Sequence, residues 1–184
     1  MPSPVHESIT CTFSEGFFDA KAQLPKPMRA NMNIVQNQNF NSFGGRYRGS
    51  SKIANLAVEF QNAAGELEPK FVVEVGFSEK YEDLVQDIRL WLEGTRGVSV
   101  VGLVKFYETP KYRRPDLDNE EIEQFPDITE IRGQHFTFEE EYGPVKFRGL
   151  AWVGCISEAF IEVWRQDPAT GSAFQDGNRM VGLP

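Results

Sequence analysis

The sequence predicts an α/β fold in which a mixed β-sheet is packed against one central helix. Residues 71–77 form a run of β-branched and aromatic residues around one carboxylate, Glu74, which is typical of a strand buried on both faces. The apolar period then changes to helical spacing over residues 79–93. A second apolar run follows at 98–106. Strand, helix and strand at this spacing predict a right-handed crossover between two parallel strands.

The ends of the predicted helix follow from local signals. Ser78 is expected to be the N-cap, because its hydroxyl can accept a hydrogen bond from the first turn. Glu82 and Asp83 suit the first turn, where the helix dipole favours negative charge. Gly94 is expected at C′, where glycine commonly ends a helix.

Three segments precede this unit. Residues 1–30 mix apolar residues with prolines and predict a short helix or a strand packed on the domain. Residues 31–50 are rich in Asn, Gln and Gly, but the interleaved apolar residues favour ordered loops or irregular strands. Residues 56–60 alternate between apolar and other residues and predict a strand that pairs antiparallel with 71–77 through a long connection.

The C-terminal half predicts extra strands after a long loop. Residues 107–134 contain three prolines and a dense acidic run, so a loop excursion with little protection from hydrogen exchange is expected there. Short strands are expected at 135–138, 145–147 and 159–164. We predict a single domain over residues 1–184, with its core at roughly 50–106.

Composition limits the class of partner. The 184 residues carry a formal charge of −8, which argues against a general polyanion binder, although an enzyme can still reach nucleic acid through a divalent metal. No apolar run is long enough to span a bilayer, so no membrane partner is expected. Cys11 and Cys155 are expected to be reduced, and the predicted location is intracellular, cytoplasmic or nuclear. A homodimer is compatible with the sequence.

Glu74 is the main candidate for chemistry. A carboxylate inside an apolar strand needs a cation, a metal or a proton. Strand pairing would bring Asn55 or Glu59 near it, and Lys80 at the helix start can reach the same region. Carboxylates that hold Mg²⁺ beside a lysine are what metal-assisted phosphodiester hydrolysis requires.

This interpretation assigns roles and leaves a structural alternative open. Glu74 and Lys80 would be catalytic, and Glu74, Asn55 and Glu59 would bind the metal. In the alternative, Glu74 pairs with a basic residue such as Arg89 and fixes the helix on the sheet, and spacing alone favours this alternative. The basic residues near the site are either surface charge or contacts to a phosphate-bearing substrate. They are Arg46, Arg48, Lys52 and Arg89.

The segments 55–60, 71–78 and 98–106, with the helix between the last two, resemble the core of the PD-(D/E)XK restriction-endonuclease-like superfamily. They are most similar to its fungal members and to the related Uma-type bacterial proteins, and the resemblance covers roughly residues 50–106. It implies a restriction-endonuclease-like fold. It also implies a strand Asp and a Glu of the next strand that bind divalent metal, with a Lys that assists.

Two positions depart from the family pattern. Ala54-Asn55 stands where the family has Pro-Asp, and Gly76 stands where Glu-x-Lys would place its lysine. Lys80 or Arg89 could replace the lysine, but Asn55 brings no negative charge to a metal. Two functions follow as hypotheses. One is a nuclease-fold protein with weak or lost Mg²⁺-dependent phosphodiester hydrolysis, and the other is a non-catalytic binding or assembly module.

Overall fold

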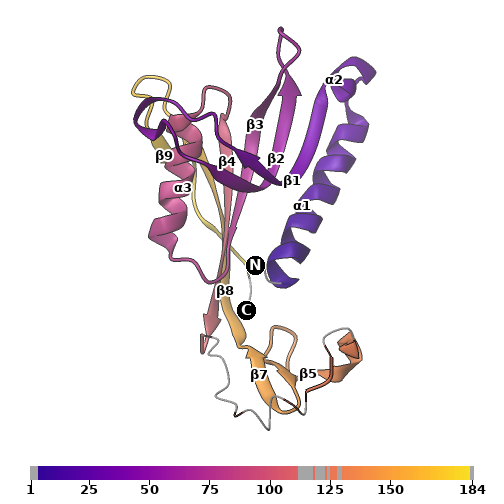
Figure 1. Cartoon of the computed structure of the whole chain (residues 1–184). Coiled ribbons are helices and arrows are strands. Elements are labelled where there is room, and N and C mark those ends of the chain that lie inside the picture. The colour runs from indigo at the N-terminus through magenta and orange to yellow at the C-terminus, as the bar shows by residue number, and fades with distance from the viewer. Residues whose placement is uncertain (1–3, 112–117, 119–122, 124, 128–129, 183–184) are drawn as a thin grey trace. The chain divides into compact units, whose positions relative to one another are not determined.

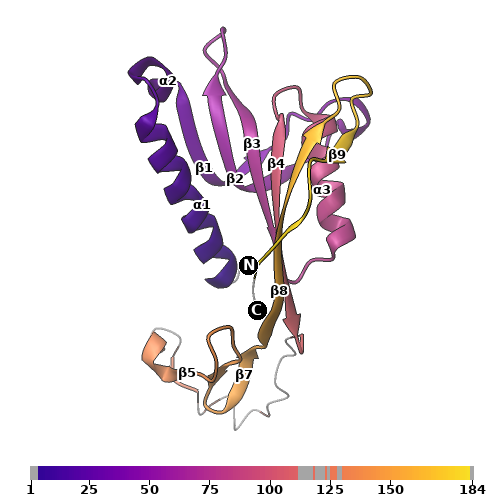
Figure 2. The ribbon, with the colours of Figure 1, turned by 180° about the vertical axis from the view of Figure 1, so that it is seen from behind.

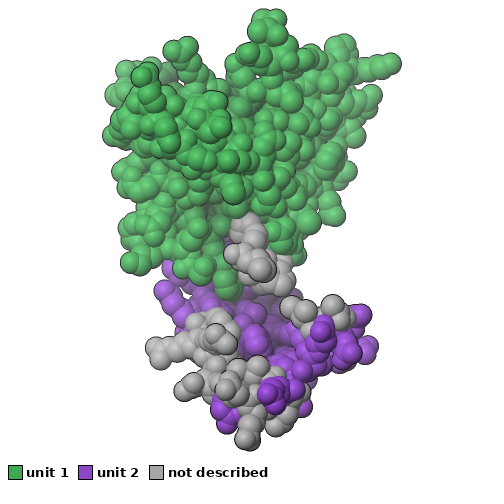
Figure 3. Space-filling view, in the orientation of Figure 1, with its two compact units in different colours: residues 1–105, 160–181 green, residues 106–159, 182–184 purple. Residues whose placement is uncertain are grey.

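A computed structural model describes residues 4–111, 118, 123, 125–127 and 130–182. The chain divides into two compact units, coloured separately in Figure 3. The first unit comprises Met1–Lys105 and Phe160–Val181, and the second comprises Phe106–Ala159 and Gly182–Pro184. Each unit is described by itself below. The expectation of one domain over the whole chain stays a prediction.

The fold is mixed α/β, as predicted. One seven-stranded sheet has the order β1-β2-β3-β4-β8-β10, and β9 pairs with β8 outside this path. Its strands are β1 (Met32–Phe40), β2 (Lys52–Gln61), β3 (Leu67–Gly76), β4 (Val100–Thr109), β8 (Cys155–Gln166), β9 (Ala173–Gln175) and β10 (Met180–Gly182).

The predicted hairpin and crossover are confirmed. β2 and β3 pair antiparallel, with Leu56 opposite Val73, and β3 and β4 pair parallel, with Glu74 opposite Leu103. Helix α3 (Tyr81–Gly94) connects the two parallel strands. Apolar residues at the centres of β2, β3 and β4 are fully buried, which explains why these strands read as nearly continuous hydrophobic runs.

Two helices cover opposite faces of this sheet. The ring of Phe17 in α1 (Pro4–Gln23) lies 5.0 Å from that of Phe71, whereas Trp91 in α3 donates a hydrogen bond to Glu74. Phe71 and Glu74 point to opposite sides of β3, because side chains alternate along a strand. Figures 1 and 2 show the two helices on either side of the sheet.

The sequence predicted one central helix, and the structure adds α1 and the short α2 (Lys26–Ala30). The 20 residues of α1 form a helix, although the sequence left helix and strand open for residues 1–30. Its apolar residues are spread around the helix, whereas those of α3 gather on one face. An amphipathic stripe is the sequence signal for a surface helix, so α1 was hard to predict.

The ends of α3 differ from the prediction. Lys80, not Ser78, is the N-cap, and its side chain makes no capping hydrogen bond. Gly94 is the last helical residue, not C′. A Cβ at Gly94 would lie 3.2 Å from the side chains of Phe43 and Tyr47, so glycine here permits the β1–β2 connection to approach the helix end closely.

Residues 31–50, for which ordered loops or irregular strands were predicted, contain the nine-residue strand β1. β1 pairs antiparallel with β2, but the pairing is interrupted at Asn37, whose φ is 53°. Asn tolerates this left-handed conformation better than most residues. The β1–β2 connection then contains one turn of 3-10 helix, η1 (Gly45–Tyr47).

The second unit contains a three-stranded antiparallel sheet in the order β5-β6-β7. β5 (Phe136–Phe138) and β6 (Val145–Phe147) were predicted, and β7 (Leu150–Val153) was not. The rings of Phe125, Phe136, Phe147 and Trp152 pack together. Of the predicted excursion at 107–134, residues 107–109 belong to β4 and residues 133–134 to the short helix η3 (Gly133–His135). Much of the remainder lies outside the described residues.

Candidate functional site

Glu74 is buried at the centre of the first unit, with 2% of its surface exposed. Its Oε1 accepts a hydrogen bond of 2.6 Å from the indole Nε1 of Trp91. Its Oε2 lies 3.8 Å from the Nζ of Lys52. Both carboxylate oxygens therefore face partners that belong to the protein itself.

Lys52 joins two elements at this centre. It lies at the start of β2, and its Nζ donates a hydrogen bond of 2.5 Å to Oδ2 of Asp87 on α3. Burial lowers the pKa of Lys52, but the charges of Glu74 and Asp87 outweigh burial and raise it. Lys52 therefore stays cationic, and its ion pair with Asp87 ties the helix to the sheet.

The environment of Glu74 favours the neutral acid. Burial raises the pKa of Glu74 to about 8, and the nearby carboxylates of Asp87 and Glu79 act in the same direction. The cation of Lys52 and the hydrogen bond from Trp91 oppose the shift without cancelling it. Burial therefore favours the protonated form of Glu74, and the closer of the two acidic partners of Lys52 is Asp87, at 2.5 Å.

Asn55 is placed beside Glu74 and is bound to the sheet. It is adjacent to Leu56, which lies opposite Val73, so Asn55 is next in register to Glu74. Its side-chain Oδ1 accepts a hydrogen bond of 2.6 Å from the backbone N–H of Val75. The amide oxygen that was predicted to bind metal is thus occupied by a hydrogen bond from the backbone.

Glu59 lies apart from the other two predicted metal ligands. It is four residues from Asn55 along β2, about 13 Å at the usual strand rise, and the β2–β3 register shifts between Val58 and Glu59. Its carboxylate accepts hydrogen bonds from the amides of Asn33 and Gln38, both at 3.1 Å. As they are placed, Glu74, Asn55 and Glu59 do not form one ion site. Within the described residues, no group of three or more His, Cys, Asp or Glu side chains is arranged to hold a metal.

The predicted basic residues are spread over the surface, apart from Lys52. Lys80, Arg48 and Arg89 are exposed, and Arg89 does not contact Glu74. Arg46 forms an ion pair with Glu93 and stacks over the ring of Tyr47 at 4.8 Å. Of the basic residues that the sequence singled out, Lys52 is the one that reaches Glu74.

Three residues of this region were not predicted. Trp91 and Asp87 lie on α3, and no sequence spacing indicates that they meet a strand residue and the start of β2. Lys105 lies on β4 opposite Gly76, is 2% exposed, and donates a hydrogen bond of 2.9 Å to the carbonyl of Phe77. The sequence did offer a signal for Lys105, because it is a lone charged residue inside the apolar run 98–106. A charge inside such a run needs a partner, which is the reason that singled out Glu74.

Comparisons of the chain with protein-family models, with curated proteins and with solved structures found no match. Within the described residues, no helix is both long enough and apolar enough to cross a bilayer.

Proposed function

We propose that this chain has the PD-(D/E)XK nuclease fold without its metal-dependent hydrolysis, and that it serves as a non-catalytic binding or assembly module. One observation carries the proposal. The two oxygens of Glu74 face the indole of Trp91 and the ammonium group of Lys52 inside the protein. The Glu74 carboxyl group thus has its polar partners inside the protein, where it connects α3 to the sheet.

The connectivity supports the fold part of the proposal. An antiparallel hairpin of β2 and β3, followed by α3 and a parallel β4, is the order of elements that the resemblance implies for residues 50–106. Glu74 lies on β3 and Asn55 on β2, which are the strands where the resemblance expects the acidic residues.

Coordination chemistry supports the loss of activity. Mg²⁺ prefers oxygen ligands that include carboxylates. Binding here would require Glu74 to ionise against its raised pKa and to give up the hydrogen bond from Trp91. It would also require the Asn55 amide oxygen to leave the Val75 N–H. The residues present do not fit the ion well.

The second candidate is a weak Mg²⁺-dependent phosphodiesterase. The observation in its favour is the 3.8 Å separation of the Lys52 Nζ and the Glu74 Oε2. The resemblance implies a lysine beside this glutamate, and Lys52 reaches it from the preceding strand, whereas Lys80 is exposed.

A cleavage assay separates the two candidates. Wild type and Glu74→Gln are incubated with single- and double-stranded DNA and RNA in the presence of Mg²⁺ or Mn²⁺. The non-catalytic proposal expects no cleavage above the level of the Glu74→Gln preparation. Metal-dependent cleavage by the wild type that Glu74→Gln abolishes would establish the second candidate instead.

A further inference from the structure

A cavity of about 490 Å³ lies in the first unit, away from the contact between Lys52 and Glu74. It is bordered by the C-terminal end of α3, the β1–β2 connection and the start of β3. Phe40 and Phe43 each pack edge-on against Trp91 at 5.2 Å and give the cavity an aromatic wall. The volume is in the range of sites that hold small organic molecules.

Glu59 brings a buried carboxylate to this cavity. It lines the cavity, yet only 3% of its surface is exposed. Its two oxygens accept one hydrogen bond each from the neutral amides of Asn33 and Gln38. Among the described residues, no lysine or arginine forms an ion pair with it. A carboxylate has about four acceptor positions, so room remains for a further donor, and a buried charge is costly without a cation.

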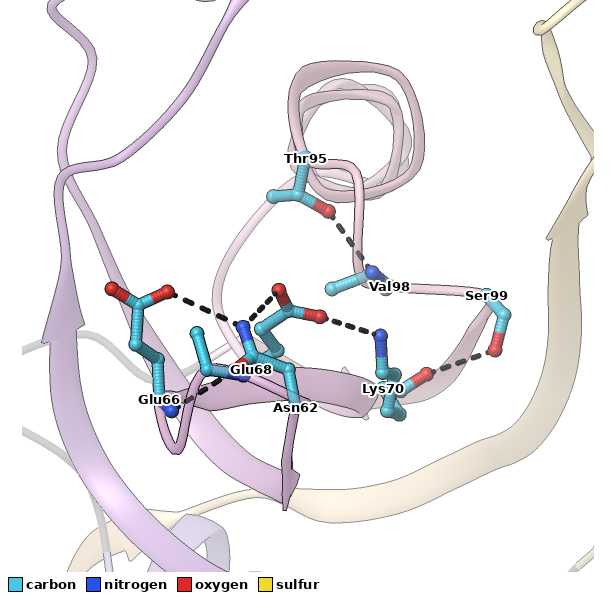
Figure 4. A network of polar contacts seen from close by, with 8 residues as sticks. Asn62, Glu66, Glu68, Lys70, Thr95, Val98 and Ser99 are labelled. Carbon is cyan, nitrogen blue, oxygen red and sulfur yellow. Dashed lines mark hydrogen bonds and ion pairs between the residues drawn. The ribbon is translucent and has the colours of Figure 1, made fainter.

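A second glutamate on the same cavity provides the contrast. Glu68 also lines it, but its carboxylate accepts hydrogen bonds of 2.8 Å from the Nζ of Lys70 and from Asn62 (Figure 4). These contacts hold the pKa of Glu68 below its ordinary value. Glu68 therefore has its own cation, whereas Glu59 has none among the residues that the structure describes.

Hydrogen bonds within the chain hold two segments that adjoin the lining of the cavity. The Oδ1 of Asn62 accepts backbone hydrogen bonds from Ala64 and Glu66 in the β2–β3 turn. In the connection after α3, Thr95 accepts a hydrogen bond of 3.1 Å from the Val98 N–H, as Figure 4 shows. A preorganised border lowers the entropy lost on binding.

We propose that this cavity is a binding site for a small aromatic amine in its protonated form. The ring would pack against Phe40 and the edge of Phe43, which cover the fully buried Trp91, and the ammonium group would donate to the free acceptor positions of Glu59. Cationic groups are also attracted to aromatic faces, which adds to the same preference. The proposal goes beyond the function proposed above and does not depend on whether Glu74 has catalytic activity.

Calorimetric titration tests the proposal with tyramine and tryptamine as probes. Their neutral counterparts are 4-ethylphenol and 3-ethylindole, which keep the ring and lack the amine. We expect saturable binding of at least one amine, and binding weaker by about tenfold or more for its neutral counterpart.

Three variants locate the site. Glu59→Gln removes the charge with little change in shape and should weaken amine binding by about tenfold or more. Glu68→Gln is the matched control and should bind like the wild type, since this side chain is already paired with Lys70. Ser42→Trp places a large ring in the cavity from an exposed position and should abolish binding while leaving the fold intact.

The outcomes are decisive in either direction. The proposal is overturned if neither amine binds the wild type, if the neutral counterparts bind equally well, or if Ser42→Trp binds unchanged. It is also overturned if a folded Glu59→Gln binds like the wild type, in which case Glu59 serves only to join β1 to β2. Should Glu59→Gln fail to fold, the neutral counterparts and Ser42→Trp still decide.

Discussion

Glu74 shows how one residue type takes opposite roles in different surroundings. In a solvated site with a metal, a glutamate is an anionic ligand. In this strand it is 2% exposed, and burial favours the protonated form. The neutral side chain accepts the Trp91 indole N–H and leaves Lys52 to pair with Asp87.

The raised pKa of Glu74 predicts how stability changes with pH. Between its ordinary value of 4.5 and the folded value of about 8, the folded chain holds a proton that the unfolded chain has lost. The free energy of unfolding should therefore fall as pH rises through this window, by at most about 5 kcal/mol, and level off above it. Glu74→Gln cannot ionise and should lack this part of the pH dependence.

Urea unfolding at a series of pH values measures this effect. The difference between the wild-type and Glu74→Gln free energies isolates the contribution of one side chain. Parallel curves for the two proteins across the window would show that Glu74 is not protonated in the folded state.

At the scale of elements, a single close contact sets how α3 packs on the sheet. A Cβ at Gly76 would lie 2.2 Å from Cδ1 of the buried Leu84. Position 76 therefore needs glycine because Leu84 leaves no room for a Cβ, and not because of the backbone conformation. A lysine at this position would meet the same obstacle in the present packing.

Gly76→Ala should destabilise the protein by about 1–3 kcal/mol, because Leu84 or the helix must move to make room. Gly102→Ala on the neighbouring strand β4 is the matched control. Its Cβ would approach no closer than 3.4 Å to Phe71, so a change within about 1 kcal/mol is expected. Denaturant unfolding compares the two, and equal losses would refute the packing argument.

Local patterns predicted the elements well, and long-range contacts could not be predicted. Continuous apolar runs and a helical stripe are properties of neighbouring residues, so β2, β3, α3 and β4 were found with their pairing. Glu74 was singled out because a charge in an apolar run needs a partner. The partners themselves depend on tertiary packing: Lys52 is 22 positions away, and Trp91 looked like an ordinary member of an apolar stripe.

At the scale of the whole molecule, the part of the first unit that comes from the end of the chain is joined to α3 through another buried glutamate. Glu162 on β8 is fully buried, with 0% exposed. It accepts hydrogen bonds from Tyr81 of α3, from Trp164 and from Arg179. The guanidinium of Arg179 also lies 3.6 Å from the centre of the Phe160 ring.

Arg179→Met should cost about 2 kcal/mol or more, because it leaves the charge of Glu162 buried without its cation. Arg165→Met is the matched control, since its ion pair with Asp176 is about half exposed on both sides and should contribute less than about 1 kcal/mol. Thermal and denaturant unfolding measure both variants. A similar small loss for each would mean that the C-terminal segment is not held by this ion pair.

We propose that Glu74 makes an internal polar contact and binds no metal, and Asn55→Asp tests this proposal most directly. The substitution introduces the acidic residue that the resemblance implies at this position. Calorimetric titration with Mg²⁺ is then performed on the wild type and on Asn55→Asp, with Glu74→Gln as the control. We predict no saturable Mg²⁺ binding by either protein, and a less stable Asn55→Asp that Mg²⁺ does not rescue, because two neighbouring carboxylates repel. Saturable binding by the wild type or by Asn55→Asp that Glu74→Gln abolishes would contradict the account.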